Sequence, residues 1–170
     1  SKWDTIFPGE AISWPTLTTH PTNSANLVNI RFLLMHGAIR IGSQARHWLK
    51  DIDLSCPSCK QKCNDVHLFL ECPTTIQAWK HVETFWATLQ KKFPKLMDYP
   101  IKKSHKLFGP PNVTAKSTQE KCIYSFMDVL LGHMQVIIWN SYNNKIFNKT
   151  DYTPTSIIET FNNQIRKSLR

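Results

Sequence analysis

The sequence predicts a mainly α fold, with a cluster of cysteines between amphipathic helices and a helical pair at the C-terminal end. Apolar residues recur at three- and four-residue spacing in several long segments. Runs of alternating β-branched residues never exceed a few positions, and Gly-rich hairpin turns are missing. Four of the five cysteines fall in the 17-residue window from Cys56 to Cys72, whereas a disulfide scaffold spreads its cysteines through the chain.

Three helices are predicted around the cysteine window. Residues 24–42 carry a wide apolar stripe that ends between Gly37 and Gly42, and a short helix over residues 43–52 follows with Ser43 as its N-cap. The stripe of the first helix contains Leu27, Ile30, Leu34 and Ala38. Behind the window, Pro73 opens a helix that Pro94 stops. The apolar face of this helix contains Ile76, Trp79, Val82, Trp86, Leu89 and Phe93.

Two further helices are predicted towards the C-terminus. Residues 117–146 show helical spacing of Ile123, Phe126, Leu130, Met134, Ile137 and Ile138. A final helix begins near Pro154, or two residues later if Ser156 and Glu159 form a capping box. Its apolar residues are Ile157, Ile158, Phe161, Ile165 and Leu169.

These elements divide the chain into three regions. Residues 1–93 form a helical part that contains the cysteine window, residues 94–116 form a basic, Pro-rich loop, and residues 117–170 supply the C-terminal helices. We expect the first and third regions to pack together, because the helices predicted over residues 73–93 and 117–146 each have an apolar stripe to cover.

The cysteine window has the ligand spacing of a zinc knuckle. Cys56 and Cys59 form a Cys-x2-Cys pair, and His67 and Cys72 follow at positions that complete a tetrahedral Cys-Cys-His-Cys shell. Four protein ligands leave no position for a reactive water, so the predicted cofactor is one structural Zn²⁺. Cys63 is then a spare, partly exposed thiol. Two alternatives stay open: Cys63 replaces Cys56 or Cys59 as a ligand, or the Cys-x2-Cys pair has a redox role.

The formal net charge of +9 indicates an anionic partner. Residues 86–170 hold 13 basic and 5 acidic side chains, whereas residues 1–85 hold 8 and 7. Six lysines lie within the 16 residues from Lys91 to Lys106, and Asp98 is the only acidic residue among them. Phosphate backbones are the commonest partner of such a stretch, although a solubilising loop has the same composition. The candidate nucleic-acid contacts are Arg40, Arg46, Lys60, Lys62, Lys91, Lys92, Lys102, Lys103 and Lys106, with Arg166, Lys167 and Arg170 at the tail. Tyr99, His105 and Phe108 are candidates for stacking on unpaired bases, while Phe108 could instead anchor the loop to the core.

The sequence predicts no catalytic residue. HExxH, Gly-rich phosphate loops and Gly-x-Ser-x-Gly are absent, and Cys122 with His133 fits core positions better than a thiol and imidazole pair. The apolar stretch over residues 129–139 is too short to span a membrane, and the first residues lack a signal-peptide pattern. We therefore expect a non-enzymatic protein of the nucleus or cytoplasm, without a membrane partner.

The segment from Ile30 to Trp86 resembles a known zinc-binding domain. The runs FLLMHGAI, ARHWL, CPSC, VHLFLECP and QAWKHVETFW are similar to successive segments of the domain that follows the reverse transcriptase in non-LTR (LINE-type) retrotransposon polyproteins. The run IIWNSYNNKIFNKT is similar, more weakly, to the final helix of that domain. The chain departs from the family's pattern at Asn64, where an acidic residue is usual, and by the extra Cys63.

The resemblance implies a zinc-stabilised, nucleic-acid-binding C-terminal domain of a retrotransposon-derived protein. Its partners would be RNA of the element or target DNA, and the family's polymerase and endonuclease residues lie in other domains. The alternative is a zinc-scaffolded protein-interaction module of a domesticated retroelement protein, which docks a protein partner or a second copy of the chain. Salt dependence separates the two, because phosphate contacts weaken steeply with salt and apolar docking does not.

Overall fold

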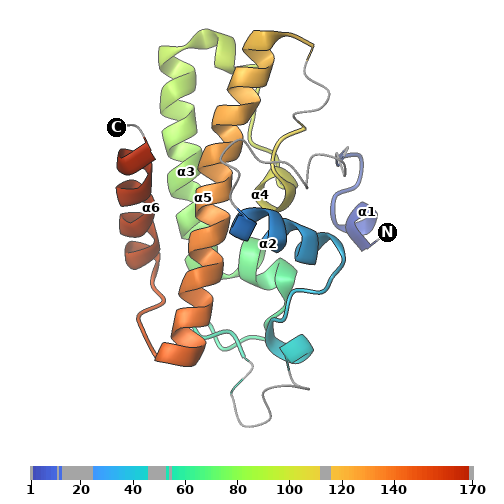
Figure 1. Ribbon diagram of the computed structural model, residues 1–170, viewed down its shortest axis with the longest axis vertical. Helices are drawn as coiled ribbons and strands as arrows, with labels where there is room; N and C mark the ends of the chain where they lie inside the picture. Colours follow the sequence, from blue (N-terminus) through green and yellow to red (C-terminus); the bar gives the residue numbers. More distant parts are fainter. Residues whose placement is uncertain are drawn as a thin grey trace.

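The computed structural model describes residues 2–10, 12, 25–45, 53, 55–111 and 116–168, and this part of the chain is mainly helical (Figure 1). Its elements are α1 (Lys2–Ile6), α2 (Ala25–Met35), the 3₁₀ turn η2 (Gly42–Ala45), the π-helical turn η3 (His67–Glu71), α3 (Pro73–Lys92), the 3₁₀ turn η4 (Pro94–Leu96), α4 (His105–Phe108), α5 (Thr118–Asn148) and α6 (Pro154–Ser168). An isolated bridge between Ser55 and Lys62 is the β pairing found among these residues. The predicted mainly α class is therefore confirmed.

The first predicted helix is observed as α2 over a shorter range. Its core face buries Leu27, Ile30 and Leu34. The helix ends at Met35, because Gly37 adopts a left-handed conformation with φ of 60°, which terminates a helix. Ala38 thus follows the helix and is exposed, contrary to the prediction. Of the predicted helix over residues 43–52, the turn η2 is observed; the remainder of that range and the side chain of Ser43 lie outside the described residues.

The helix α3 begins and ends at the two prolines that predicted it. Pro73 is its first residue, where no N–H is needed, and Pro94 follows the C-cap residue Phe93. Trp79, Val82 and Trp86 form its buried face. Ile76 is 49% exposed, because it follows the buried Thr75 by one residue, which turns its side chain by about 100°. Phe93 has left the helical conformation and is 56% exposed. Both residues were predicted on the apolar face, and neither belongs to the core.

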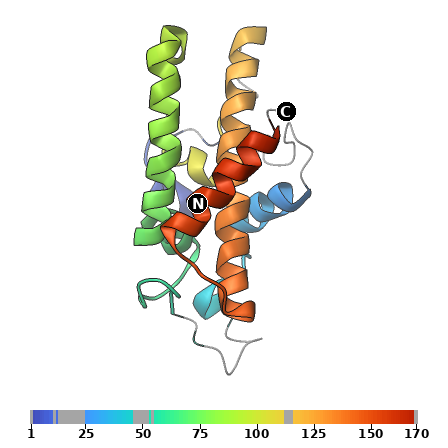
Figure 2. The same cartoon turned by 90° about the vertical axis from the view of Figure 1, so that its left-hand side faces the viewer.

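The long helix α5 is the centre of the fold. The Ser117 hydroxyl accepts a hydrogen bond from the Glu120 N–H at 3.1 Å and caps the first turn, and Lys149 ends the helix with φ of 55°. Leu130, Met134, Ile137 and Ile138 are buried as predicted, whereas Ile123 and Phe126 are only partly buried. α2, α3, α4 and α6 all contact α5, which runs between them through the bundle (Figures 1 and 2).

By length and composition alone, α5 is the one helix in the described part of the chain that could cross a membrane. Half of its most apolar window is buried inside the fold, and buried polar residues of the same helix bond to α2. The core helix of a folded domain meets the same test of length and hydropathy.

The last helix, α6, lies across α3 and α5 (Figure 2). It buries Ile157, Phe161 and Ile165. Its first turn is held by Thr153 and Ser156: the Ser156 N–H donates to the Thr153 hydroxyl at 3.2 Å, and the Thr153 N–H donates to the Ser156 hydroxyl at 3.3 Å. The reciprocal cap thus begins three residues before the predicted pair of Ser156 and Glu159, because Thr153 is the first residue outside the helix.

Residues 94–111 pack on the core instead of forming a simple extended loop. The short helix α4 buries His105, Leu107 and Phe108. The Phe108 ring meets the Trp3 ring edge-on, with 5.0 Å between ring centroids. Phe108 therefore anchors this segment, which was one of its two predicted roles, and it is not available to stack on a base.

A buried ion pair joins α2 to α5. Arg31 Nη2 donates to Asp128 Oδ1 at 2.5 Å, with side chains 2% and 5% exposed. Arg31 Nε donates to Gln135 Oε1 at 3.0 Å, and Gln135 donates in turn to the Lys106 carbonyl at 2.8 Å. Gly109 closes over the pair with φ of 76°, and a Cβ there would lie 2.4 Å from Asp128 Oδ1. The network thus fixes α2, α4 and α5 together, and position 109 requires glycine.

Removing one member of this pair should be costly. We expect Arg31→Met to lower the free energy of unfolding by about 3–5 kcal/mol, because the buried Asp128 carboxylate loses its ion pair with the Arg31 guanidinium. The double variant Arg31→Met/Asp128→Leu should recover much of that loss, since it buries no charge. Chemical denaturation followed by circular dichroism measures both. A double variant that is no more stable than Arg31→Met would contradict this account.

Candidate metal centre

The knuckle is a tight turn that presents the first two cysteines. The Lys60 N–H donates to the Cys56 carbonyl at 2.9 Å, and the Cys56 N–H donates to the Gln61 carbonyl at 2.8 Å. Lys60 takes a left-handed conformation with φ of 62°, which reverses the chain directly after Cys59. The Cys-x2-Cys spacing therefore places both thiols on the inside of one turn.

A π-helical turn presents the other two candidate ligands. Asn64 starts it, because its side-chain Oδ1 accepts from the His67 N–H at 2.8 Å. The Cys72 N–H then donates to the His67 carbonyl at 2.7 Å. This i to i+5 bond sets the backbones of His67 and Cys72 side by side, a pairing that an α-helical i to i+4 pattern would not make. Asn64, where the resembling family has an acidic residue, thus acts as the cap of the turn.

Two backbone carbonyls of the π-helical turn accept hydrogen bonds from side chains of α3. The Thr75 hydroxyl donates to the Leu68 carbonyl at 2.7 Å, and the Trp79 indole N–H donates to the Phe69 carbonyl at 2.7 Å. All four residues are buried, where an unpaired carbonyl would cost about 1–3 kcal/mol. The sequence predicts Trp79 only on the apolar face of the helix; the hydrogen bond from its indole N–H gives it a second, positioning role.

The four predicted ligands meet at one point. Cys56, Cys59, His67 and Cys72 bring their sulfur and nitrogen atoms within 4.8 Å of one another. The Cys56 and Cys72 sulfurs are 3.6 Å apart, and the Cys59 sulfur lies 3.3 Å from His67 Nε2. Tetrahedral ligation at about 2.3 Å to sulfur and about 2.0 Å to nitrogen gives ligand separations of about 3.5–3.8 Å. The cluster therefore has the chemistry and spacing to hold one metal ion.

Cys63 lies outside this cluster, but its exposure differs from the prediction. It is 1% exposed, not partly exposed, because the chain turns inward between the knuckle and the π-helical turn. Of the predicted ligand sets, the structure thus brings together the one without Cys63. Cys63 instead packs beside Cys56 and near Tyr142, whose hydroxyl accepts from the Gly42 N–H at 3.3 Å.

Contacts among the thiols and burial disfavour their ionisation in the absence of a metal. Contact with the Cys63 thiol and burial raise the pKa of Cys56 to about 11. Contact with Cys56 and burial raise the pKa of Cys72 as well. Burial also raises the pKa of the neighbouring Tyr142 to about 12, so this hydroxyl stays protonated at neutral pH. Among the described residues, no Lys or Arg side chain is in hydrogen-bond contact with these thiols, so a metal cation bound between them would stabilise the thiolates.

The predicted basic contacts do not form one patch. Lys60 and Lys62 lie at the knuckle, and Lys91 and Lys92 lie in the last turn of α3. The 20 residues of α3 separate the two pairs, a rise of about 30 Å at 1.5 Å per residue. Lys102, Lys103, Arg40, Arg166 and Lys167 are exposed, whereas Arg46 and Arg170 lie outside the described residues.

Lys106 is a structural residue and not a free contact. Its ammonium lies 2.6 Å from a Glu83 carboxylate oxygen and 5.9 Å from the centroid of the Trp79 ring, and its side chain is only 17% exposed. The expectation that the lysines of this segment have Asp98 as their only nearby acid is thus wrong for Lys106, because α3 supplies Glu83 from outside the segment. Lys60 also has an acidic neighbour, Asp53, at 3.5 Å, but both are exposed, and such pairs contribute little.

Two other interpretations are corrected. His105 is buried, and its burial together with the charge of Lys102 lowers its pKa to about 4, so it is neutral at pH 7 and cannot stack on a base. Cys122, expected in the core with His133, is exposed, because it lies on the outer side of the first turns of α5. His133 is partly buried and contacts Gln164 Oε1 at 3.1 Å.

Comparisons of the chain with protein-family models, with curated proteins and with solved structures find no match.

Metal binding at this site should strengthen as pH rises. The raised pKa values of Cys56 and Cys72 mean that both thiols carry protons below about pH 11, and each must lose its proton to become a ligand. Releasing these two protons, in addition to any held by the third thiol ligand, Cys59, predicts that the apparent affinity for Cd²⁺ rises by at least about 100-fold per pH unit between pH 6 and 8. Competition titrations with a chelator measure this slope. An affinity that is independent of pH would exclude thiolate ligands.

Proposed function

We propose that the protein is a zinc-stabilised domain that binds nucleic acid, and that it belongs to a LINE-type reverse transcriptase protein. Three thiols and one imidazole within 4.8 Å of one another support zinc as the ion, because Zn²⁺ favours a tetrahedral set of sulfur and nitrogen ligands. Four protein ligands give the ion a structural role and leave no open position for a catalytic water. Three thiolates and Zn²⁺ together carry one negative charge, so the zinc-bound protein stays strongly basic.

The observation that supports nucleic-acid binding is a set of exposed lysines without ion-pair partners among the described residues. Lys91, Lys92, Lys95, Lys102 and Lys103 are exposed, and none of them has an ion pair within the described part of the chain. They follow one another from the end of α3 into the segment before α4. Such lysines contact phosphates at low desolvation cost and give a salt-dependent affinity. RNA of an element and its DNA target are the partners that the sequence resemblance supports.

We expect one tightly held zinc ion per chain. Chelation should unfold the knuckle and the start of α3, because a structural zinc site supplies part of the folding free energy. Cys59→Ser should reduce the zinc content to well below one ion per chain, measured by elemental analysis of the purified protein. Cys63→Ser is the matched control, since it changes a buried cysteine that is not in the ligand cluster, and its zinc content should stay at one. If Cys63→Ser loses zinc and Cys59→Ser keeps it, Cys63 is a ligand in place of Cys59.

The second prediction tests binding. Replacing Lys102 and Lys103 together with Gln should weaken single-stranded RNA binding and reduce the salt dependence, by about 0.7 in the slope of log K against log salt for each lost contact. Filter binding at several salt concentrations measures both quantities. Lys106→Gln is the control and should leave RNA affinity unchanged, because Lys106 is engaged with Glu83. Wild-type protein that binds neither RNA nor DNA at low salt would refute the proposed function.

A further inference from the structure

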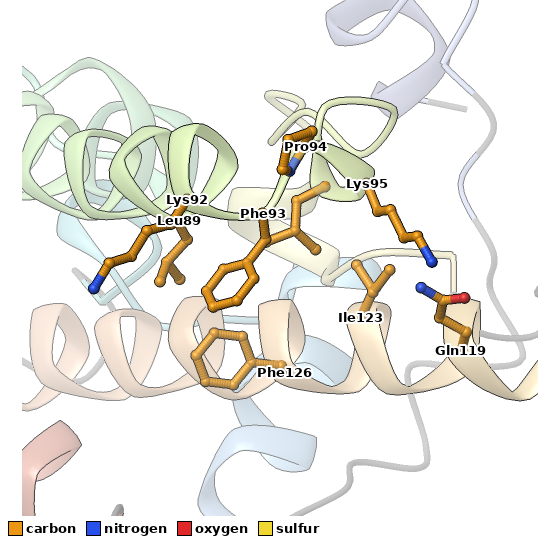
Figure 3. A pocket seen from close by; sticks show the side chains of 9 residues that line it. Leu89, Lys92, Phe93, Pro94, Lys95, Gln119, Ile123 and Phe126 are labelled. Atoms are coloured by element: carbon orange, nitrogen blue, oxygen red, sulfur yellow. The ribbon is translucent and has the colours of Figure 1, made fainter.

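An apolar groove of about 600 Å³ lies at the end of α3 that is remote from the metal centre. Leu89 and Phe93 lie on one side of the groove and Ile123 and Phe126 of α5 on the other (Figure 3), and Leu96 of η4 also lines it. Figure 3 shows the rings of Phe93 and Phe126 facing each other across this space. Four of the lining residues, Leu89, Phe93, Ile123 and Phe126, are thus residues that the sequence places on core faces but that the fold leaves partly or largely exposed.

The groove is open because α3 and α5 extend beyond the rest of the bundle. α6 crosses the lower and middle parts of the two helices, and their upper ends project past it (Figure 2). Phe93 is 56% exposed, and Leu89, Leu96, Ile123 and Phe126 are only partly buried. The segment after α3 packs beside this end, with Tyr99 against Tyr124, but it leaves the apolar side chains of the groove partly exposed to solvent, and adjacent exposed apolar groups of this kind often mark a binding surface.

The charge around the groove is positive. Lys92 and Lys95 are the charged residues in its lining, and no acidic residue lines it. Their side chains extend on either side of Phe93 (Figure 3), so the ammonium groups flank the apolar floor. Acidic residues, Asp98 and Glu120, begin only in a smaller polar pocket of about 210 Å³ beyond Lys95.

We infer that this groove binds a short amphipathic helix of a partner protein, one that has two or three large apolar side chains and acidic residues on its flanks. Apolar side chains at positions i, i+3 or i+4, and i+7 would enter between the Phe93 and Phe126 rings, as in other helix-in-groove complexes. Carboxylates beside them would meet Lys92 and Lys95. The inference stands beside nucleic-acid binding and does not depend on it.

Two other occupants fit the groove less well. A nucleobase has several polar edge groups, and apart from Gln119 and the two ammonium groups the lining offers it leucine, isoleucine, proline and phenylalanine side chains, against which unpaired polar groups are costly. A second copy of the chain would bring two sets of the same lysines together, in a protein of formal net charge +9, and like charges oppose that contact.

The test uses the full zinc-bound chain and three fluorescein-labelled 15-residue peptides. Each has Leu, Ile or Phe at helical spacing among Glu and Ala, and each has a control peptide with Lys in place of Glu. We expect at least one acidic peptide to bind, and its lysine counterpart to bind at least about tenfold more weakly, because the flanking charges then repel. Fluorescence polarisation measures the affinities.

Matched variants locate the binding to the groove. Phe93→Ser should weaken binding at least about tenfold; Met97→Ser, which changes a residue 62% exposed in the same segment but outside the groove lining, should not. Lys92→Glu/Lys95→Glu should weaken binding of the acidic peptide, whereas Lys102→Glu/Lys103→Glu should leave it unchanged. All six substitutions in these four variants are at exposed positions, so the circular dichroism spectrum should stay as in the parent protein.

Several outcomes would overturn the inference. One such outcome is that none of the three acidic peptides binds at a protein concentration of about 1 mM, because any Kd would then be weaker than that of a transient contact. Equal losses from Phe93→Ser and Met97→Ser would place the contact elsewhere. A loss of RNA affinity in Phe93→Ser, together with displacement of the peptide by single-stranded RNA, would assign the groove to nucleic acid. A concentration-dependent dimer that Phe93→Ser abolishes would assign it to a second copy. None of these results depends on whether the lysines 102 and 103 contact phosphate.

Discussion

The junction at Cys72 is the constraint on which the rest of the structure depends. Cys72 contributes a sulfur to the candidate metal site, its N–H closes the π-helical turn onto His67, and it is the N-cap of α3. A metal held by the knuckle would thus fix the direction in which α3 leaves the site. Because α3 carries Trp79 and Trp86 into the core and supports both α5 and α6, the position of that one residue orients most of the bundle.

The core is held by polar contacts as well as apolar ones. Arg31 and Asp128 lie opposite each other inside the protein, and Gln135 and Gly109 complete their surroundings. Such a pair gains little net stability over apolar packing, since its Coulomb energy is offset by desolvation. It does set how α2 lies against α5, because a shifted helix would leave a buried charge without its partner.

The two ends of α3 have different properties. Its N-terminal end directly follows the candidate ligand Cys72, buries Thr74 and Thr75, and is tied to the π-helical turn by the Trp79 indole. Its C-terminal end projects beyond α6, carries Lys91 and Lys92 and borders the apolar groove. The candidate metal site is at one end of α3, and the exposed lysines and apolar side chains are at the other. Contacts with a partner at the C-terminal end would therefore not disturb the ligands.

The sequence by itself determined what depends on spacing and on local stop signals. Cys-x2-Cys with His67 and Cys72 predicted the ligand cluster, and Pro73, Pro94 and Ser117 marked the helix ends, because a helix boundary is a local property of the backbone. Only the tertiary structure decided which apolar and charged residues are covered. It buried Cys63, paired Lys106 with Glu83 and left Phe93 exposed, since burial depends on which distant element packs against a residue, and helical periodicity does not encode that.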